Sequence, residues 1–284
     1  YVSASAQERA DDIHQMFSDN EIKAIICAIG GDHANQILKH IDFDLIRNNP
    51  KIFVGYSDIS VLHYAFLSQA DLQTFYGPNL MTDFGEYPKI LDYTKEYFEK
   101  AVSNEGTIGK VMSSEMWTDE ILDWGQKKDL ERARKLVKSE GYKWLKEGFS
   151  TGEIVGGCVP SINHLIGTKY WVDPSNRIFF IDIPEGFEFG TGLSIGEFDS
   201  YLADLDNIGV FSSIKGLIVG RPYRYDKNQY EKLDKIIMKY CGDYNYPVLL
   251  NANIGHASPI ITVPYLTMTE LNSSENTFKI LNEQ

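Results

Sequence analysis

The amino-acid sequence predicts an α/β protein of two domains. The N-terminal domain is expected to be a doubly wound parallel sheet of the Rossmann or flavodoxin-like kind, and the C-terminal domain a mixed, strand-rich α/β fold. Short apolar runs alternate with helical patterns over the first 80 residues, and glycine-rich, strand-like runs dominate after residue 150. The length of 284 residues is ample for two domains, and 43% hydrophobic residues can build a large core.

The first domain is predicted to span residues 1–80. Its helices are expected over residues 7–17, 34–40 and 59–68, and its strands over residues 24–29, 51–54 and 72–76. Helices inserted between short apolar strands indicate a parallel sheet. Functional groups in such sheets gather at the carboxyl ends of the strands. Gly30, Gly31 and Ser57 follow predicted strands, so we expect all three at one edge.

Residues 81–150 are rich in aromatic and charged side chains and are predicted to connect the domains, with helices over residues 93–102 and 129–146. The second domain is predicted over residues 151–284. Its strands are expected over residues 153–157, 177–182, 216–220, 247–250, 259–264 and 277–281, and its helices over residues 195–205 and 229–240.

Composition and charge narrow the class of protein. A net charge of −13 argues against binding to polymeric nucleic acid, which requires a basic face. No apolar run approaches the about 20 residues of a membrane span. The three cysteines Cys27, Cys158 and Cys241 lack metal-ligand or redox spacing, which favours a reducing, cytoplasmic compartment. No zinc pattern and no nucleotide-binding loop is present, so neither a metal nor a cofactor is expected.

The most informative motif is Gly55-Tyr56-Ser57-Asp58-Ile59-Ser60, which follows an apolar run and precedes a helical pattern. A strand that turns into a helix through Gly-x-Ser can hold a serine hydroxyl exposed above a sheet. Amide groups at the start of the helix can also stabilise an oxyanion. The alternative is that Ser57 or Asp58 is simply the N-cap of the helix.

A serine nucleophile needs a base and an acid that orients the base. His256 lies in a loop bounded by Gly255 and Pro259 between two predicted strands, which is typical of a site residue, although a structural turn is the alternative. Asp182 ends an apolar strand, with Glu185 close behind it. Either carboxylate could hold an imidazole, and Asp182 could equally cap the segment that follows.

Several separated stretches resemble the LD-carboxypeptidase family of serine peptidases, which includes the microcin C self-immunity peptidases. These stretches are GYSDIS, TFYGP, GEIVGG, RIFFIDIPEG, GLIVGRPY and NIGHASPIITVPY, in the family's order. The resemblance covers nearly the whole chain. It also implies a first strand and helix ahead of Ser3, so we expect this chain to be a fragment of a longer protein.

The resemblance implies a Ser-His-Glu triad with Ser57 as nucleophile and His256 as base. The family's Glu corresponds to Asp182, which is shorter by one methylene, so Glu185 stays open as the alternative acid. The oxyanion donors correspond to the amides of Asp58 and Gly31.

Two further positions bear on the substrate. Trp117, in a Met-Trp-Thr-Asp-Glu stretch similar to one in the microcin immunity branch, is expected to stack on a planar substrate group or to be a buried anchor. Cys158 replaces an Asn that this branch often carries.

The sequence therefore predicts a serine carboxypeptidase or amidase, and the family resemblance implies that it forms a homodimer. Its substrate is expected to be a small peptide or a peptidyl-nucleotide of the microcin C type. The alternative substrate is a murein tetrapeptide cut at its L,D bond. The alternative from another class is a non-catalytic, two-lobed binding protein for a small molecule.

Overall fold

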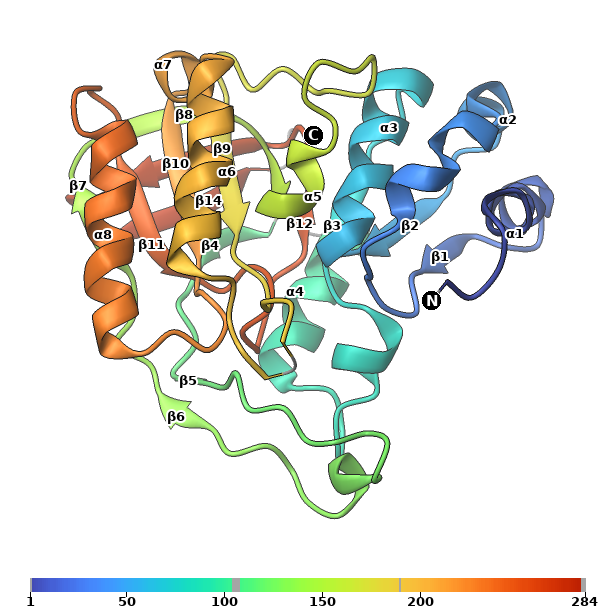
Figure 1. Ribbon diagram of the computed structural model, residues 1–284, viewed down its shortest axis with the longest axis horizontal. Helices are drawn as coiled ribbons and strands as arrows, with labels where there is room; N and C mark the ends of the chain where they lie inside the picture. The colour runs from blue at the N-terminus through green and yellow to red at the C-terminus, as the bar shows by residue number, and fades with distance from the viewer. Residues whose placement is uncertain (1, 104–107, 189, 282–284) are drawn as a thin grey trace.

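The computed structural model describes residues 2–103, 108–188 and 190–281. A smaller sheet and a larger sheet lie side by side, each with its own helices (Figure 1). The smaller sheet has the order β1-β2-β3-β12. Strands β1 (Ala24–Ile26), β2 (Ile52–Gly55) and β3 (Phe75–Tyr76) are parallel, and β12 (Val263–Pro264) pairs antiparallel with β3. A strand from the C-terminal part of the chain thus completes the N-terminal sheet.

The helices of the first domain are α1, η1, α2 and α3, which span Ala6–Ser18, Ala34–His40, Phe43–Asn48 and Ser60–Ala70. A capping box between Ser5 and Glu8 starts α1, whose apolar side is buried. Helix α3 is buried on nearly all sides. This burial follows from its position between the two sheets, where it contacts α2 on one side and α5 and β8 on the other (Figure 1).

The larger sheet has eight strands in the order β4-β14-β13-β8-β9-β10-β11-β7. The four central strands are parallel: β8 (Phe149–Cys158), β9 (Ile178–Asp182), β10 (Gly216–Gly220) and β11 (Val248–Ala252). The flanking strands are antiparallel: β4 (Gly109–Val111), β7 (Lys143–Lys146), β13 (Met268–Asn272) and β14 (Thr277–Leu281). The central strands are buried on both faces, as parallel strands covered by helices must be.

Helices α5 (Val159–Asn163), α6 (Ile195–Asn207), α7 (Val210–Ser213) and α8 (Lys227–Cys241) belong to this second sheet. Helices α6 and α8 lie in front of it in the view of Figure 1. Both begin with a capping box, from Ser194 to Glu197 and from Asp226 to Gln229. The α/β class with a parallel N-terminal sheet and a strand-rich C-terminal part is confirmed.

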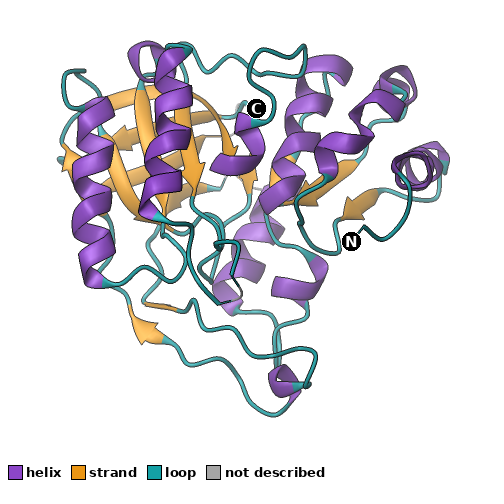
Figure 2. Ribbon diagram, viewed as in Figure 1, coloured by secondary structure: helices purple, strands orange, loops and turns teal. Residues whose placement is uncertain are grey.

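The segment between the two parts runs as long loops with short elements (Figure 2). These elements are η3 (Leu80–Phe84), α4 (Asp92–Val102), β5 (Met116–Trp117), η4 (Lys128–Leu130) and β6 (Val137–Lys138), with β4 and β7 joining the larger sheet. Among the described residues, no helix is both long and apolar enough to cross a lipid bilayer.

The predicted helix over residues 129–146 is wrong, because this stretch contains η4, β6 and β7 instead. Several of its basic residues pair instead with carboxylates from other parts of the chain. Arg132 pairs with Glu120, Arg134 with Glu86, and Lys143 with Asp234, all distant in the chain. Tertiary ion pairs and the pairing of β7 with β11 therefore override the local helical pattern. Three predicted strands are also shorter than expected, since β1, β3 and β12 cover only parts of residues 24–29, 72–76 and 259–264.

Candidate active site

Ser57 occupies the turn between β2 and α3, where its backbone has a positive φ of 66°. This conformation is uncommon for a residue other than glycine. A Cβ at Gly30 would lie 2.6 Å from the Cβ of Ser57 and 2.7 Å from its Oγ, so only glycine leaves room beside the serine. A short helical segment, η2 (Ser57–Ile59), precedes α3. The N-cap residues of η2 and α3 are Tyr56 and Ile59, and neither helix has a side-chain cap. The interpretation of Ser57 or Asp58 as an N-cap is therefore wrong. The turn presents a hydroxyl at the carboxyl edge of the sheet.

His256 lies in the loop after β11, and this loop is held from several sides. The Asn253 side chain donates to the Oγ of Ser114 at 2.7 Å and to the Pro259 carbonyl at 2.9 Å. The backbones of Ser258 and Thr118 exchange hydrogen bonds of 2.7 and 2.9 Å. The connecting segment therefore fixes the position of the histidine loop.

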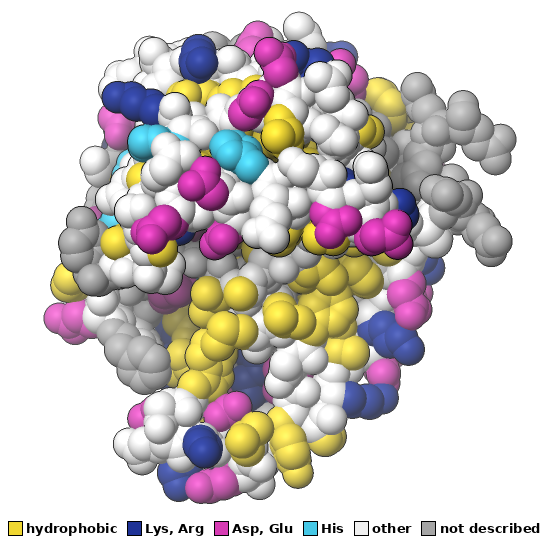
Figure 3. Space-filling model, turned by 90° about the vertical axis from the view of Figure 1, so that its right-hand side faces the viewer, with side chains coloured by type: hydrophobic (Ala, Val, Ile, Leu, Met, Phe, Trp, Pro, Cys, Tyr) yellow, Lys and Arg dark blue, Asp and Glu magenta, His cyan; other side chains and the backbone are white. Residues whose placement is uncertain are grey.

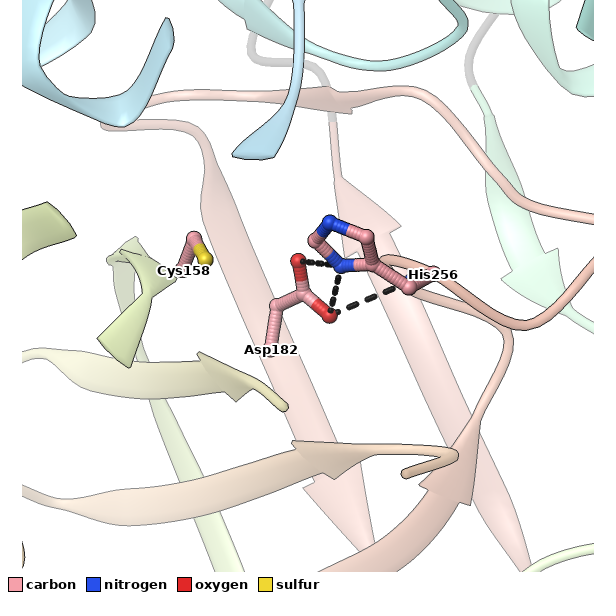
Figure 4. Close-up of side chains that lie close together, drawn as sticks. All are labelled: Cys158, Asp182 and His256. Atoms are coloured by element: carbon pink, nitrogen blue, oxygen red, sulfur yellow. Dashed lines mark hydrogen bonds and ion pairs between the residues drawn. The ribbon is translucent and has the colours of Figure 1, made fainter. Parts of the chain in front are cut away.

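Asp182 ends β9 and is completely buried. Its carboxylate accepts a hydrogen bond from Nδ1 of His256, with N–O distances of 2.8 and 3.0 Å to its two oxygens, and another from the His256 amide at 3.2 Å (Figure 4). Gly255 has a φ of 91°, and a Cβ there would lie 1.8 Å from an Asp182 oxygen. The histidine loop can approach the carboxylate this closely only because residue 255 is glycine.

The structure brings Ser57, His256 and Asp182 together from three distant parts of the chain. The Nε2 of His256 lies 3.0 Å from the Oγ of Ser57, although 199 positions separate the two residues. The three side chains follow the order hydroxyl, imidazole and carboxylate that nucleophilic serine chemistry requires.

Glu185 occupies a different place from Asp182. Its carboxylate lies 3.3 Å from Nε2 of His256, on the side of the ring that faces Ser57, and is 57% exposed. Burial alone would lower the pKa of the His256 imidazole, but the carboxylates of Asp182 and Glu185 outweigh this effect and raise that pKa to about 9.

Asp58 and Gly31 lie where the Gly30-Gly31 turn meets the serine turn. The buried carboxylate of Asp58 accepts a hydrogen bond from the amide of Ala34 at 2.7 Å. A Cβ on Gly31, whose φ is 146°, would lie 3.9 Å from that carboxylate. The Asp58 side chain thus ties the start of η1, just after the glycine turn, to the turn that carries Ser57, which the sequence did not indicate.

Sequence reasoning also missed Tyr76 and Ser60. The Tyr76 hydroxyl donates to Asp182 and accepts from the Ser57 amide at 3.3 Å. The Ser60 hydroxyl donates to the Ser57 carbonyl at 2.7 Å and accepts from the Cys158 amide at 3.0 Å. Tyr76 ends β3 inside the TFYGP stretch, and its position at the end of a parallel strand was the signal that could have found it.

Trp117 and Trp124 have different surroundings. The Trp117 ring lies against the buried Arg221 guanidinium, 4.5 Å from its centroid, and is not among the residues that line the main cavity. Trp124 does line that cavity and is 40% exposed. Of these two tryptophans, it is therefore Trp124 that faces the cavity.

The main cavity has a volume of about 690 Å³ and opens in front of Ser57 and His256. Its wall combines backbone of both turns with exposed apolar side chains and several charges. The lining residues with large apolar side chains are Ile29, Tyr56, Met81, Tyr87, Ile121, Leu122, Trp124, Phe187 and Tyr223. Figure 3 looks onto the right-hand side of Figure 1, where hydrophobic side chains gather in the lower half of the face.

One cluster of three potential metal ligands occurs among the described residues. The donor atoms of Cys158, Asp182 and His256 lie within 4.8 Å of one another (Figure 4). Nδ1 of His256 already donates to Asp182, and burial together with the Asp182 charge raises the pKa of the Cys158 thiol far above its usual value. A metal would require a thiolate and a free ring nitrogen, so these residues fit a hydrogen-bonded triad better than a metal site.

Comparison with known proteins gives a consistent result over the whole chain. The LD-carboxypeptidase N-terminal domain profile matches residues 1–77, and the C-terminal domain profile matches residues 151–271. The microcin C7 self-immunity protein MccF of Escherichia coli is 30% identical over 93% of this chain and 75% of its own length. The protein named "Probable murein peptide carboxypeptidase" of Bacillus subtilis is 30% identical over 98% of this chain and 77% of its own length.

A solved structure has the same fold. MccF in complex with aspartyl sulfamoyl adenosine superposes with a TM-score of 0.87 at 28% identity, over 100% of this chain and 83% of that chain. These matches cover both sheets and the segment between them. The chain belongs to the LD-carboxypeptidase family of serine peptidases.

Proposed function

We propose that this carboxypeptidase cleaves an amide bond with Ser57 as nucleophile, His256 as base and Asp182 as the acid that orients the base. The Oγ of Ser57 attacks the carbonyl carbon while its proton passes to Nε2 of His256. The same proton then goes to the leaving nitrogen, and water hydrolyses the acyl-enzyme by the reverse sequence. The observation that carries the proposal is the 3.0 Å separation of Ser57 Oγ and His256 Nε2.

Asp182 is proposed over Glu185 as the orienting acid. A triad acid must accept a hydrogen bond from the N–H of the ring nitrogen that faces away from the nucleophile, because this bond sets the tautomer. Asp182 meets Nδ1 of His256, whereas Glu185 lies beside Nε2. The shorter side chain at position 182 is supported by the close approach of the Gly255 backbone.

The amides of Asp58 and Gly31 are proposed to hold the oxyanion. Both belong to turns that pack directly against Ser57, and the Asp58 carboxylate ties the start of η1, just after the glycine turn, to the serine turn. A preorganised amide donor of this kind contributes about 3–4 kcal/mol to transition-state stabilisation.

Acyl-nucleotides of the microcin C type are the proposed substrates. The cavity of about 690 Å³ can hold a nucleotide-sized molecule, and the half-exposed ring of Trp124 offers a stacking surface. We propose Trp124, rather than Trp117, for this contact, because Trp117 is engaged with Arg221. The related MccF has been solved with aspartyl sulfamoyl adenosine, an aminoacyl group joined through a sulfamoyl link to adenosine.

A murein tetrapeptide is the second candidate, favoured by the similarity to the Bacillus subtilis relative. Its terminal carboxylate would need a cation in the cavity. Arg134 is the one lysine or arginine among the described lining residues, and Glu86 neutralises it. This pairing leaves no free lysine or arginine for that carboxylate among the described lining residues. The homodimer and the cytoplasmic location stay predictions. Membership of a serine peptidase family supports an enzyme over a non-catalytic binding protein.

Ser57→Ala tests the proposal when both substrates are assayed side by side. Aspartyl sulfamoyl adenosine and a murein tetrapeptide are offered to the wild type, to Ser57→Ala and to the control Ser68→Ala, which changes an exposed serine of α3. We expect the wild type and the control to cleave aspartyl sulfamoyl adenosine faster than the murein tetrapeptide. We expect Ser57→Ala to cleave neither substrate. Cleavage by Ser57→Ala at the wild-type rate would refute the nucleophile.

A further inference from the structure

The carboxylate of Glu185 stands at the entrance to the reaction centre. Its Oε2 lies 3.3 Å from Nε2 of His256, and the Oγ of Ser57 lies 3.0 Å from the same nitrogen. Nε2 can share one proton at a time, so the carboxylate and the hydroxyl compete for it. More than half of the Glu185 side chain is exposed toward the cavity, so a ligand can reach it.

The backbone that carries Glu185 is firmly placed. Glu185 and Gly192 form a β-bridge, the Gly186 amide donates to the Thr191 carbonyl at 2.8 Å, and the Leu193 amide donates to the Pro184 carbonyl at 3.0 Å. A Cβ on Gly192 would lie 2.1 Å from the Tyr223 carbonyl, so this hairpin packs tightly on its neighbour. The exposed side chain of Glu185 can therefore turn toward a ligand while these contacts hold its backbone.

Two carboxylates on one imidazole create a problem for catalysis. Asp182 at Nδ1 and Glu185 at Nε2 both stabilise the imidazolium, and the buried Asp83 adds a weaker effect of the same sign, while the Tyr56 ring packs against the imidazole without charge. These carboxylates raise the pKa of the His256 imidazole to about 9 and so favour its protonated form. A protonated Nε2 cannot accept the proton of Ser57, so Glu185 must be drawn away or neutralised before the attack.

The charges around the cavity indicate which kind of ligand group could draw the Glu185 carboxylate away from His256. The carboxylates of Glu86 and Glu120 are paired with Arg134 and Arg132. Among the described residues, no lysine or arginine forms an ion pair with the lining carboxylates of Asp129, Glu185 and Glu188. The cavity thus presents an excess of negative charge beside the hydroxyl, and this excess favours a cation in the ligand.

We propose that Glu185 selects substrates with a protonated amino group next to the scissile carbonyl, that is aminoacyl amides with a free α-amine rather than N-acylated peptides. This inference rests on the function proposed above. An α-nitrogen lies about 2.5 Å from the carbonyl carbon, and that carbon lies about 3 Å from the attacking oxygen. The ammonium group can therefore reach Glu185 while the carbonyl faces Ser57. Its pairing with Glu185 releases the Nε2 proton to solvent and leaves the base ready.

Ligand binding to catalytically inactive variants tests the proposal. Calorimetry compares aspartyl sulfamoyl adenosine with its Nα-acetyl derivative in Ser57→Ala and in Ser57→Ala/Glu185→Gln. We expect acetylation to weaken binding at least 10-fold in the first variant and less than about 3-fold in the second, because an ionic hydrogen bond is lost only in the first. Ser57→Ala/Glu185→Asp should recover part of the difference, and Ser57→Ala/Glu188→Gln should keep it.

The proposal would be overturned if acetylation of the ligand weakened binding equally in all four variants. It would also be overturned if neither ligand bound. A second readout needs no ligand. NMR titration of the His256 ring should show a pKa at least one unit lower in Glu185→Gln than in the wild type, and an unchanged titration would also overturn the proposal. Neither readout depends on turnover, so a failure of Ser57 as nucleophile would be seen separately in the assay of Ser57→Ala.

Discussion

The phenol of Tyr76, at the end of a strand in the first sheet, donates a hydrogen bond to the carboxylate of Asp182, at the end of a strand in the second. Both groups are buried, and the Tyr76 hydroxyl also accepts a hydrogen bond from the Ser57 amide at 3.3 Å. One side chain therefore sets the position of the proposed acid relative to the proposed nucleophile across the junction between the sheets.

Tyr76→Phe should lower kcat by about 10-fold with little change in KM, because it removes one donor to the buried carboxylate and loosens the serine turn. The matched control is Tyr265→Phe, which removes a hydroxyl that donates to the Gly156 carbonyl at 2.9 Å in the same aromatic cluster. Steady-state kinetics and the free energy of unfolding of both variants check this. Equal kcat in the two variants would show that Tyr76 has no positioning role.

Asp182→Asn should lower kcat by about 10³–10⁴-fold, because the amide no longer holds the imidazole in the productive tautomer. The carboxylate raises the pKa of His256, so its removal should also move the acidic limb of kcat/KM to lower pH. The pH–rate profiles of the wild type and the variant measure both effects. If the acidic limb of kcat/KM stayed at the same pH in Asp182→Asn, the assignment of Asp182 as the orienting acid would be contradicted.

Gly30→Ala should lower kcat at least 100-fold, because the added methyl would lie 2.7 Å from the Oγ of Ser57 and displace it. The control is Gly196→Ala in α6, where an added Cβ meets no atom within 4 Å and should stabilise the helix slightly. Activity and circular dichroism of both variants separate displacement of the hydroxyl from misfolding. Near wild-type activity of Gly30→Ala would mean that the turn relaxes freely.

His63 should make the protein sensitive to acid. Its ring is fully buried between Thr74 and the Gly55 carbonyl, and burial lowers its pKa to about 4. In the unfolded chain the His63 imidazole takes up a proton near pH 6.5, whereas the folded protein keeps it neutral down to about pH 4. The contribution of neutral His63 to the free energy of unfolding is therefore complete above pH 6.5. It is lost as the pH falls toward about 4, and the loss is roughly 3 kcal/mol.

Urea unfolding at pH 7.5 and pH 4.5 checks this prediction. His63→Gln should be less stable at pH 7.5 but should lose less stability between the two values than the wild type. His40→Gln, which changes an exposed histidine, is the control and should behave like the wild type. An equal loss in all three proteins would mean that other groups dominate acid unfolding.

The sequence was informative wherever local pattern and strand-end position agreed. The alternation of strands and helices predicted the parallel sheet, and Ser57, Asp182 and His256 could be singled out because each follows or ends an apolar strand. Their meeting at hydrogen-bond distance depends on the packing of the two sheets, which the local patterns do not contain.

Other features depend on partners that the local sequence does not contain. Residues 129–146 have a helical charge pattern, but Arg134 and Lys143 find carboxylates far away in the chain. Trp117 and Trp124 lie only seven positions apart, and the tertiary structure alone shows that the first packs against the buried Arg221 while the second lines the cavity. Tyr76 and Asp182 are likewise joined only through the packing of the two sheets.

The central claim is that Ser57 and His256 act as one unit, and kcat/KM of Ser57→Ala, His256→Ala and the double variant tests it most directly. Each single variant should lose at least about 10⁴-fold, and the double variant should be within about 10-fold of either one, because removal of one partner already disables the other. Losses that multiply in the double variant, or a single variant near the wild-type rate, would contradict the account.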